Sequence, residues 1–265
     1  MRDLQRGTFR TKNVLQPDYY SSSRIYMVIK LQNSTALGLI LGSNKINLKA
    51  LDSFTGREVD TDFGKAFVLA GTQEKLIILP RHGKNSNIPP HEINHHANML
   101  AFKKLGVEKI ISFTSVGSLK VELKPGHIVL PDDYIDLGKI CTYFDNKIHH
   151  IIPGMDDGLR EQIFNKIKQM PFEVKYNAIY IQTQGPRLET KAEIQMLKNF
   201  GDIVGMTMAA EATLAKELGL GYANISIIGN YCNGLIEKPL TIEILKENQT
   251  KDSENILKII RKLLK

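Results

Sequence analysis

The sequence has few cysteines and no long apolar stretch, and each absence narrows the class of protein. Its 265 residues include two cysteines, Cys141 and Cys232, which are too few for a disulfide framework and lack metal-type spacing. No run approaches the roughly 18 apolar residues of a membrane span, and the N-terminus lacks the apolar core of a signal peptide. We therefore expect a protein of the reducing cytoplasm without a membrane partner.

Composition and charge leave several kinds of partner open. With 42% apolar residues, the chain can bury one large core, so we expect a single domain over residues 31–265 after a loosely ordered arm, residues 1–30. The net charge of +7 suits an anionic partner, either a phosphate-bearing small molecule or nucleic acid. Basic residues cluster only in residues 258–265, which also form an amphipathic helical pattern, so we expect no nucleic-acid partner.

Short apolar runs that end in polar loops alternate with helical patterns, which is typical of α/β proteins. Runs at 66–70 and 76–79 are separated by a short polar segment and predict a β-hairpin. Its second strand ends at Arg81 and His82, a guanidinium and an imidazole donor that suit an oxyanion. The same pair also suits a solvent-facing turn. Other apolar runs also predict strands, at 36–41, 109–113, 178–183, 203–205 and 223–228.

One stretch, residues 184–190, carries a carboxylate just past a predicted strand. Small ligands bind where loops leave the carboxyl ends of strands in open α/β sheets, so Glu189 is a candidate substrate contact. The same residues admit a simpler interpretation, in which Glu189 and Thr190 cap the helix predicted from Lys191.

A second pattern suggests a different chemistry. His91, Glu92 and His95 satisfy H-E-x-x-H, in which two histidines one helical turn apart ligate zinc and the glutamate activates water. However, Pro89 and Pro90 would place His91 in the first helical turn, and no third ligand follows nearby. A zinc hydrolase thus remains an alternative, as does a non-catalytic nucleotide or nucleic-acid binder, while our first hypothesis includes no metal.

Several separated motifs together resemble one enzyme family. Gly-Pro-Arg-Leu-Glu-Thr at 185–190, Gly-Met-Thr at 205–207 and Asn230 follow the order seen in the trimeric purine nucleoside phosphorylase and methylthioadenosine phosphorylase family. The resemblance implies a single-domain, three-layer α/β fold with a mixed central β-sheet flanked by helices. It also implies an enzyme that uses inorganic phosphate to release purine bases from nucleosides in purine salvage, without a cofactor.

The resemblance also implies roles for individual residues. The family's glycine-rich loop places Ser43 at phosphate, although Asn44 stands where the family has glycine. Met206 corresponds to a ribose contact, and Leu188 to a base contact. His150, in the irregular segment 138–158, corresponds to a contact with a neighbouring subunit, in a trimer or hexamer. The further phosphate-binding residues that the resemblance implies are Arg81, His82, Thr114, Ser115 and Thr207, with His82 and Asn230 as catalytic residues.

Glu189 and Asn230 together indicate the base. The family has Asn at the second position in enzymes for 6-oxopurines and Asp in those for 6-aminopurines. A 6-oxopurine presents an N1–H donor and an O6 acceptor, which a carboxylate and a carboxamide N–H can meet. We therefore predict hypoxanthine or guanine as the base of inosine, guanosine or methylthioinosine, with 5′-methylthioadenosine as the alternative.

Overall fold

The computed structural model describes residues 36–42, 53–71, 75–237 and 239–265. The predicted arm, residues 1–30, and Ser43 therefore lie outside the described residues. Within the described ranges, eleven strands form one mixed sheet. The strands are β1 (Ala36–Leu41), β2 (Thr55–Thr61), β3 (Gly64–Ala70), β4 (Leu76–Pro80), β5 (Val107–Ser118), β6 (Ile128–Leu130), β7 (Asp133–Asp136), β8 (Val174–Tyr176), β9 (Ile179–Gln182), β10 (Ile203–Gly205) and β11 (Gly221–Tyr231).

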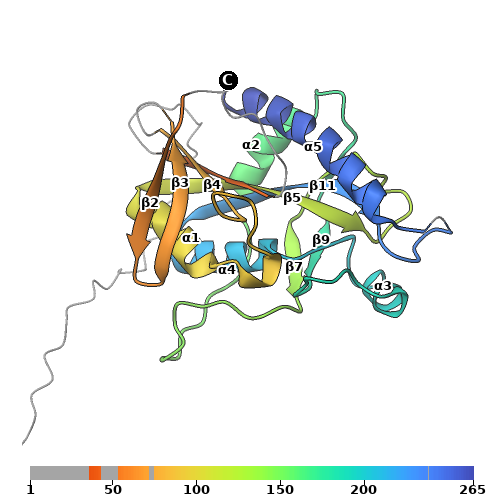
Figure 1. Ribbon diagram of the computed structural model, residues 1–265, viewed down its shortest axis with the longest axis horizontal. Helices are drawn as coiled ribbons and strands as arrows, with labels where there is room; N and C mark the ends of the chain where they lie inside the picture. Colours follow the sequence, from red (N-terminus) through yellow and green to blue (C-terminus); the bar gives the residue numbers. More distant parts are fainter. Residues whose placement is uncertain (1–35, 43–52, 72–74, 238) are drawn as a thin grey trace, which may run out of the picture. The chain divides into compact units, whose positions relative to one another are not determined.

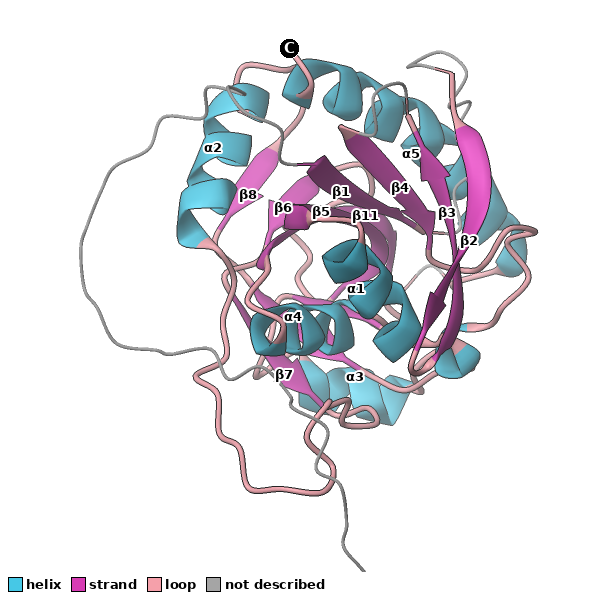
Figure 2. Cartoon of the chain, turned by 90° about the vertical axis from the view of Figure 1, so that its left-hand side faces the viewer, coloured by secondary structure: helices cyan, strands magenta, loops and turns pink. Residues whose placement is uncertain are grey.

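Of the five α-helices in the described ranges, α1 and α4 cover one face of the sheet, and α2 and α5 cover the other (Figure 1). Met99 and Phe102 of α1 pack in one apolar core with Met208 of α4. Ile163 of α2 and Ile259 of α5 pack in another core on the opposite face (Figure 2). This arrangement confirms the predicted α/β fold with a mixed sheet between helices. The helices are α1 (His95–Lys104), α2 (Asp157–Ile167), α3 (Lys191–Leu197), α4 (Met208–Glu217) and α5 (Ile242–Leu263).

The predicted hairpin is present, because β3 and β4 pair antiparallel. The preceding strand β2, which was not predicted, pairs with β3 along its whole length. Its side chains are mostly exposed, so its sequence lacks the apolar alternation that identifies a half-buried strand. On its other side, β4 pairs in parallel with β1. This pairing brings Arg81 to the end of β1, where its backbone N–H donates to the Leu41 carbonyl.

Two central strands are longer than their apolar runs predict. We expected β5 to end near Phe113, before a loop over residues 114–119, but the strand continues to Ser118. Similarly, β11 continues past Ile228 to Tyr231. The two strands pair in parallel from Lys109 and Gly221 onward, and these ladder hydrogen bonds keep polar residues extended that would form turns in isolation.

The long strand β5 has different neighbours along one edge. Its first half pairs with β1 as far as Ser112, and its last residues, Gly117 and Ser118, pair with β10. Among the described residues, no strand pairs with residues 113–116 on this edge. The ends of β1, β4, β9, β10 and β11 all meet around this open segment, which is where the polar motifs of the sequence converge.

Candidate active site

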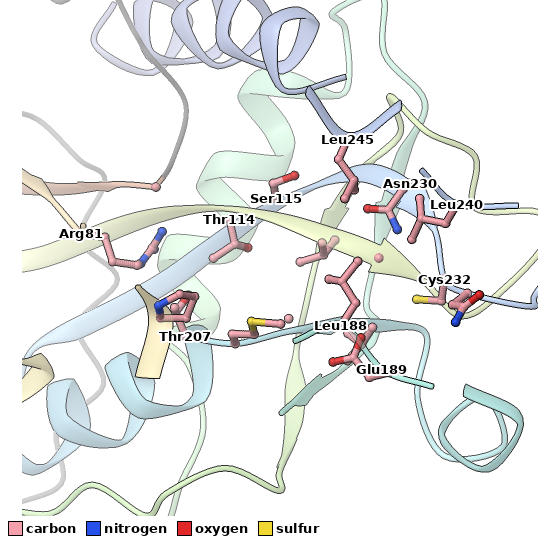
Figure 3. A pocket seen from close by; sticks show the side chains of 18 of the residues that line it. Arg81, Thr114, Ser115, Leu188, Glu189, Thr207, Asn230, Cys232, Leu240 and Leu245 are labelled. Atoms are coloured by element: carbon pink, nitrogen blue, oxygen red, sulfur yellow. The ribbon is translucent and has the colours of Figure 1, made fainter. Parts of the chain in front are cut away.

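A pocket lies beside residues 113–116 of β5, on the edge where no described strand pairs with them. Nearly all of the predicted site residues line this pocket. Arg81 and Thr207 lie at one end, and Glu189 and Asn230 lie at the other (Figure 3). Thr114 and Ser115 lie between the two ends. The full lining comprises Gly42, Arg81, His82, Pro90, Phe113, Thr114, Ser115, Val116, Gly117, Leu188, Glu189, Val204, Gly205, Met206, Thr207, Asn230, Cys232, Asn233, Leu240 and Leu245.

Arg81 is a buried cation held in a fixed orientation. Its Nε and Nη2 donate to the two carboxylate oxygens of Glu211, at 2.5 and 3.2 Å. Nη1 donates to the backbone carbonyl of Phe113 at 2.8 Å, and Nη2 also donates to Ser112. A guanidinium has five N–H groups, and these contacts leave one on Nη1, which would lie 2.8 Å from a Cβ built on Gly42 at the pocket wall.

Glu211 was not assigned a role from the sequence, yet it organises this end of the pocket. Besides Arg81, it accepts hydrogen bonds from Ser112 at 2.7 Å and from Tyr222 at 2.8 Å. Burial opposes its ionisation, but the adjacent charge and hydrogen bonds of Arg81 lower the pKa of Glu211 below its usual value. The carboxylate is therefore ionised and balances a guanidinium that would otherwise be buried without a counter-charge.

His82 follows Arg81 and faces the same pocket. Its Nδ1 lies 2.7 Å from the carbonyl oxygen of Ile88, and because a carbonyl only accepts, Nδ1 must carry a proton. Burial and the charge of Arg81 lower the pKa of His82, so the ring is neutral near pH 7. In this tautomer Nε2 is an acceptor, whereas we had expected the imidazole to act as a donor.

The start of α4 places Met206 and Thr207 against the pocket. Thr207 is the N-cap residue of α4, but its hydroxyl makes no capping hydrogen bond. Its backbone N–H donates to the buried hydroxyl of Tyr180 at 3.3 Å. The Gln182 side chain instead accepts from the first free N–H groups of the helix, at Ala209 and Ala210. The Thr207 hydroxyl therefore remains available to a ligand at the positive end of the helix.

Two predicted residues of β5 differ in how they face the pocket. The hydroxyl of Thr114 hydrogen-bonds to Asn224 at 3.2 Å and Ser226 at 2.9 Å, within the sheet. Ser115 is exposed and lines the pocket. Backbone groups two residues apart in a strand point to the same edge, so the Ser115 N–H points to the edge on which the Phe113 carbonyl meets Arg81.

At the other end of the pocket, the loop after β9 presents Leu188 and Glu189. Glu189 is buried and accepts a hydrogen bond from the Thr183 hydroxyl through Oε1. It does not cap α3, because Thr190 is the N-cap and forms a reciprocal capping box with Glu193. The helix start thus uses Thr190, and the pocket uses Glu189.

Asn230 reaches the pocket through an irregularity in β11. The pairing with β5 shifts register between Ile228 and Asn230, so Gly229 forms a β-bulge. Such bulges re-aim side chains and are frequent next to active sites. The Asn230 Nδ2 donates one hydrogen bond to the carbonyl of Tyr231 at 2.9 Å, which leaves the second N–H and the amide oxygen.

The lining of the pocket includes two leucines that sequence reasoning missed. Leu240 and Leu245, just before and within the start of α5, line the pocket. Thr241, which lies between them, caps α5 by accepting from the Ile244 N–H. The apolar spacing of an amphipathic helix gave no sign that Leu245 faces a ligand rather than the core.

The zinc pattern does not form a zinc site. His91 and Glu92 lie in a short 3₁₀ helix, Pro90–Glu92, whereas His95 begins α1, so the two histidines do not share one helical face. His95 is buried, and burial lowers its pKa to about 4. Within the described ranges, no group of three or more His, Cys, Asp or Glu side chains could hold a metal ion. These observations disfavour the zinc hydrolase alternative.

His150 lies apart from these residues, in the segment between β7 and α2, and does not line the pocket of its own chain. The role implied for it, a contact with a neighbouring subunit, remains a prediction.

In the described part of the chain, no helix is long and apolar enough to cross a membrane.

Comparison with known proteins identifies the family. A sequence model of the phosphorylase superfamily matches residues 36–265. The chain belongs to the phosphorylase superfamily. A probable 6-oxopurine nucleoside phosphorylase of Archaeoglobus fulgidus is 38% identical over 234 residues, covering 86% of this chain and 96% of the relative. A probable S-methyl-5′-thioinosine phosphorylase of Methanocaldococcus jannaschii is 40% identical over 208 residues, covering 76% and 82%.

A solved structure also resembles this one. Methylthioadenosine phosphorylase from Schistosoma mansoni, solved in complex with adenine, superposes with a TM-score of 0.76 at 25% identity, covering 87% of this chain and 91% of that one. The resemblance predicted from the sequence is therefore confirmed, and the protein is an enzyme of the purine nucleoside phosphorylase type.

Proposed function

We propose that the protein releases a 6-oxopurine base from its nucleoside and transfers the sugar to inorganic phosphate. The observation that carries this proposal is that one pocket holds a buried guanidinium at one end and a carboxylate with a carboxamide at the other. The first set suits an oxyanion, and the second set suits the edge of a 6-oxopurine. Met206 lies on the wall of the same pocket and offers an apolar surface to the sugar.

Phosphate would bind at the Arg81 end. The remaining Arg81 N–H, the Thr207 hydroxyl and the Ser115 backbone N–H would donate to its oxygens. His82, with its proton on Nδ1, would accept a hydrogen bond from a protonated phosphate oxygen. Thr114 supports this region from within the sheet, and Ser43 remains a proposed contact outside the described residues. No cofactor is required.

Hydrogen-bond polarity at the other end favours a 6-oxopurine. The Glu189 side chain would accept from the purine N1–H, and the remaining Asn230 N–H would donate to the purine near O6 and N7. Adenine presents a lone pair at N1 that would face the Glu189 carboxylate. Buried polar groups mismatched in this way can discriminate by roughly 10⁴-fold.

The reaction follows from this arrangement. As the N-glycosidic bond breaks, its electron pair moves to the purine, and positive charge develops on the anomeric carbon. A phosphate oxygen then bonds to that carbon from the opposite face, giving the sugar 1-phosphate. Asn230 stabilises the purine anion until it takes up a proton, as donors in an oxyanion hole do for other developing charges.

The two leucines at the start of α5 favour an apolar 5′ substituent on the sugar. Leu240 and Leu245 are the side chains that this segment contributes to the pocket, and a 5′-methylthio group would bury apolar surface against them. A 5′-hydroxyl would gain no hydrogen bond from either side chain. We therefore propose that methylthioinosine is a better substrate than inosine or guanosine.

The proposed assembly is a homotrimer or a dimer of trimers in the cytoplasm. The segment between β7 and α2 exposes Ile140, Ile148 and Ile152, at 78%, 91% and 85% of their surface. Exposed apolar side chains gathered on one segment are typical of a contact surface. In the proposed assembly, this segment would carry His150 to the pocket of a neighbouring subunit.

The test is release of free base from inosine, guanosine, adenosine, methylthioinosine and methylthioadenosine, each with and without phosphate. We expect phosphate-dependent cleavage of the 6-oxopurine nucleosides, fastest for methylthioinosine. Cleavage of adenine nucleosides at comparable rates would overturn the assigned base specificity, and cleavage that does not need phosphate would overturn the assigned reaction.

A further inference from the structure

The C-terminal helix contacts the bulge that aims Asn230. The side-chain Nδ2 of Asn248, in α5, donates to the carbonyl oxygen of Gly229 at 2.6 Å. Gly229 is the extra residue of the β-bulge and directly precedes Asn230. Its neighbour Ile228 is fixed on the other side, where its N–H and carbonyl pair with His127 and Gly126. The Asn248 contact therefore holds the carbonyl group of the extra residue in the bulge.

A second polar side chain of the same helix face lies beside this contact. Asp252 is one turn after Asn248, so both side chains project to the same face of α5. Asp252 is 2% exposed, and its Oδ2 has no hydrogen-bond partner. A Cβ built on Gly229 would lie 2.6 Å from the Ser115 hydroxyl and 3.8 Å from Asp252 Oδ2, so α5, β5 and the bulge meet here without spare room.

We propose that Asn248 is a positioning residue that holds the Gly229 bulge and, through it, aims Asn230 into the pocket, and that the buried Asp252 beside this contact modulates it. This role rests on the proposed function of Asn230 as the donor to the purine. Leu245, one turn before Asn248, lines the same pocket. A sugar substituent that contacts Leu245 is thereby linked through one helix to the residue that stabilises the departing base.

Protonation of Asp252 adjusts this contact. Burial raises the pKa of Asp252 to about 7, against a smaller lowering by the Ser115 hydroxyl of β5. Among the described residues, no charged group of β5, β11, α2 or α5 contributes to this shift. The neutral carboxyl is tolerated at this site, but the carboxylate that forms above pH 7 favours water and so favours separation of α5 from the bulge.

The first test observes Asn230 directly, without substrate. The side-chain amide signals of Asn230, assigned by their loss in Asn230→Ala, are recorded by NMR between pH 6 and 8. We expect Asn248→Ala to shift these signals and Asn255→Ala, two turns further along α5, to leave them in place. We also expect the wild-type signals to move with pH and those of Asp252→Asn to stay constant. Unchanged signals in Asn248→Ala would overturn the proposal.

The second test is a double-mutant cycle on the rate of base release. Asn248→Ala should lower kcat by about tenfold in the wild type, with KM for phosphate unchanged, and by less than about twofold in Asn230→Ala. Equal losses in both backgrounds would show a general structural role and overturn the proposal. An inactive wild type whose Asn230 signals still respond to Asn248→Ala would instead refute the proposed function and leave the positioning role standing.

Discussion

At the scale of single residues, the site depends on buried polar groups that satisfy one another. Glu211 orients Arg81 through both carboxylate oxygens, and Thr183 holds Glu189 at the other end. In each pair, the first side chain does not line the pocket, and it fixes a second side chain that we propose contacts the substrate. The loss of such a partner should therefore change substrate handling as well as stability.

We predict that Glu211→Gln weakens phosphate binding strongly. The amide keeps the shape but removes the charge that balances Arg81, and breaking a buried ion pair typically costs about 3–5 kcal/mol. KM for phosphate should rise by about tenfold or more, and the melting temperature should fall. The matched control is Glu58→Gln, which breaks an exposed pair with Lys65 and should change neither value appreciably. Unchanged phosphate affinity in Glu211→Gln would show that Arg81 needs no fixed orientation.

We also predict that Glu189→Gln changes base preference. The amide can donate to the N1 lone pair of adenine, so activity on inosine should fall by about two orders of magnitude while the ratio of adenosine to inosine cleavage rises. Measurement of kcat/KM for both nucleosides tests this, with Glu193→Gln of the adjacent capping box as the control. An unaltered ratio would remove Glu189 from the base site.

At the scale of elements, the apolar runs predicted where the strands lie better than they predicted the residues at which the strands end. The runs 36–41 and 203–205 match β1 and β10, because buried strands consist almost entirely of apolar residues. Residues 114–118 and 229–231 contain Thr, Ser, Gly and Asn, which favour turns locally. They stay extended because β5 and β11 pair with each other, and a partner more than 100 positions away in the chain leaves no local signal.

The candidate site was predictable where motifs resemble the family and unpredictable where function depends on tertiary partners. Arg81, Glu189 and Thr207 all line the pocket as expected. Glu211 could not be assigned, because one carboxylate in a helix of alanines resembles a solvated position until its partners are known. Leu245 was missed for the opposite reason, since an apolar residue of an amphipathic helix is usually core.

The docking of α5 makes a prediction about stability and pH. The pKa of Asp252 is raised in the folded protein to about 7, above the value of about 3.8 expected in the unfolded chain. The folded state therefore binds more protons, and Asp252 lowers the free energy of unfolding as pH rises from about 4 to 7, by on the order of 2–4 kcal/mol. The melting temperature of Asp252→Asn should exceed that of the wild type by an amount that grows over this range. Above about pH 8 the difference should be constant. A difference in melting temperature that is the same at every pH would contradict a buried, protonated carboxyl at Asp252.

At the scale of the whole molecule, assembly should depend on the segment between β7 and α2. Ile148 is 91% exposed there, and a charge at this position would have to be desolvated in the proposed trimer. We predict that Ile148→Lys lowers the molar mass measured by light scattering to that of a smaller species and reduces base release. Val121→Lys, at a position 56% exposed elsewhere on the chain, should leave the mass unchanged. An unchanged mass in Ile148→Lys would exclude this segment from the contact.

The open edge of β5 has a consequence for the energetics of substrate binding. Residues 113–116 lie between the end of β1 and the start of β10, and among the described strands none pairs with them there. A ligand that accepts from the Ser115 amide would take the place of a neighbouring strand and complete the local ladder of hydrogen bonds. Substrate would then act as a structural part of the sheet, and its binding would slow amide hydrogen exchange along β5 itself as well as in the surrounding loops.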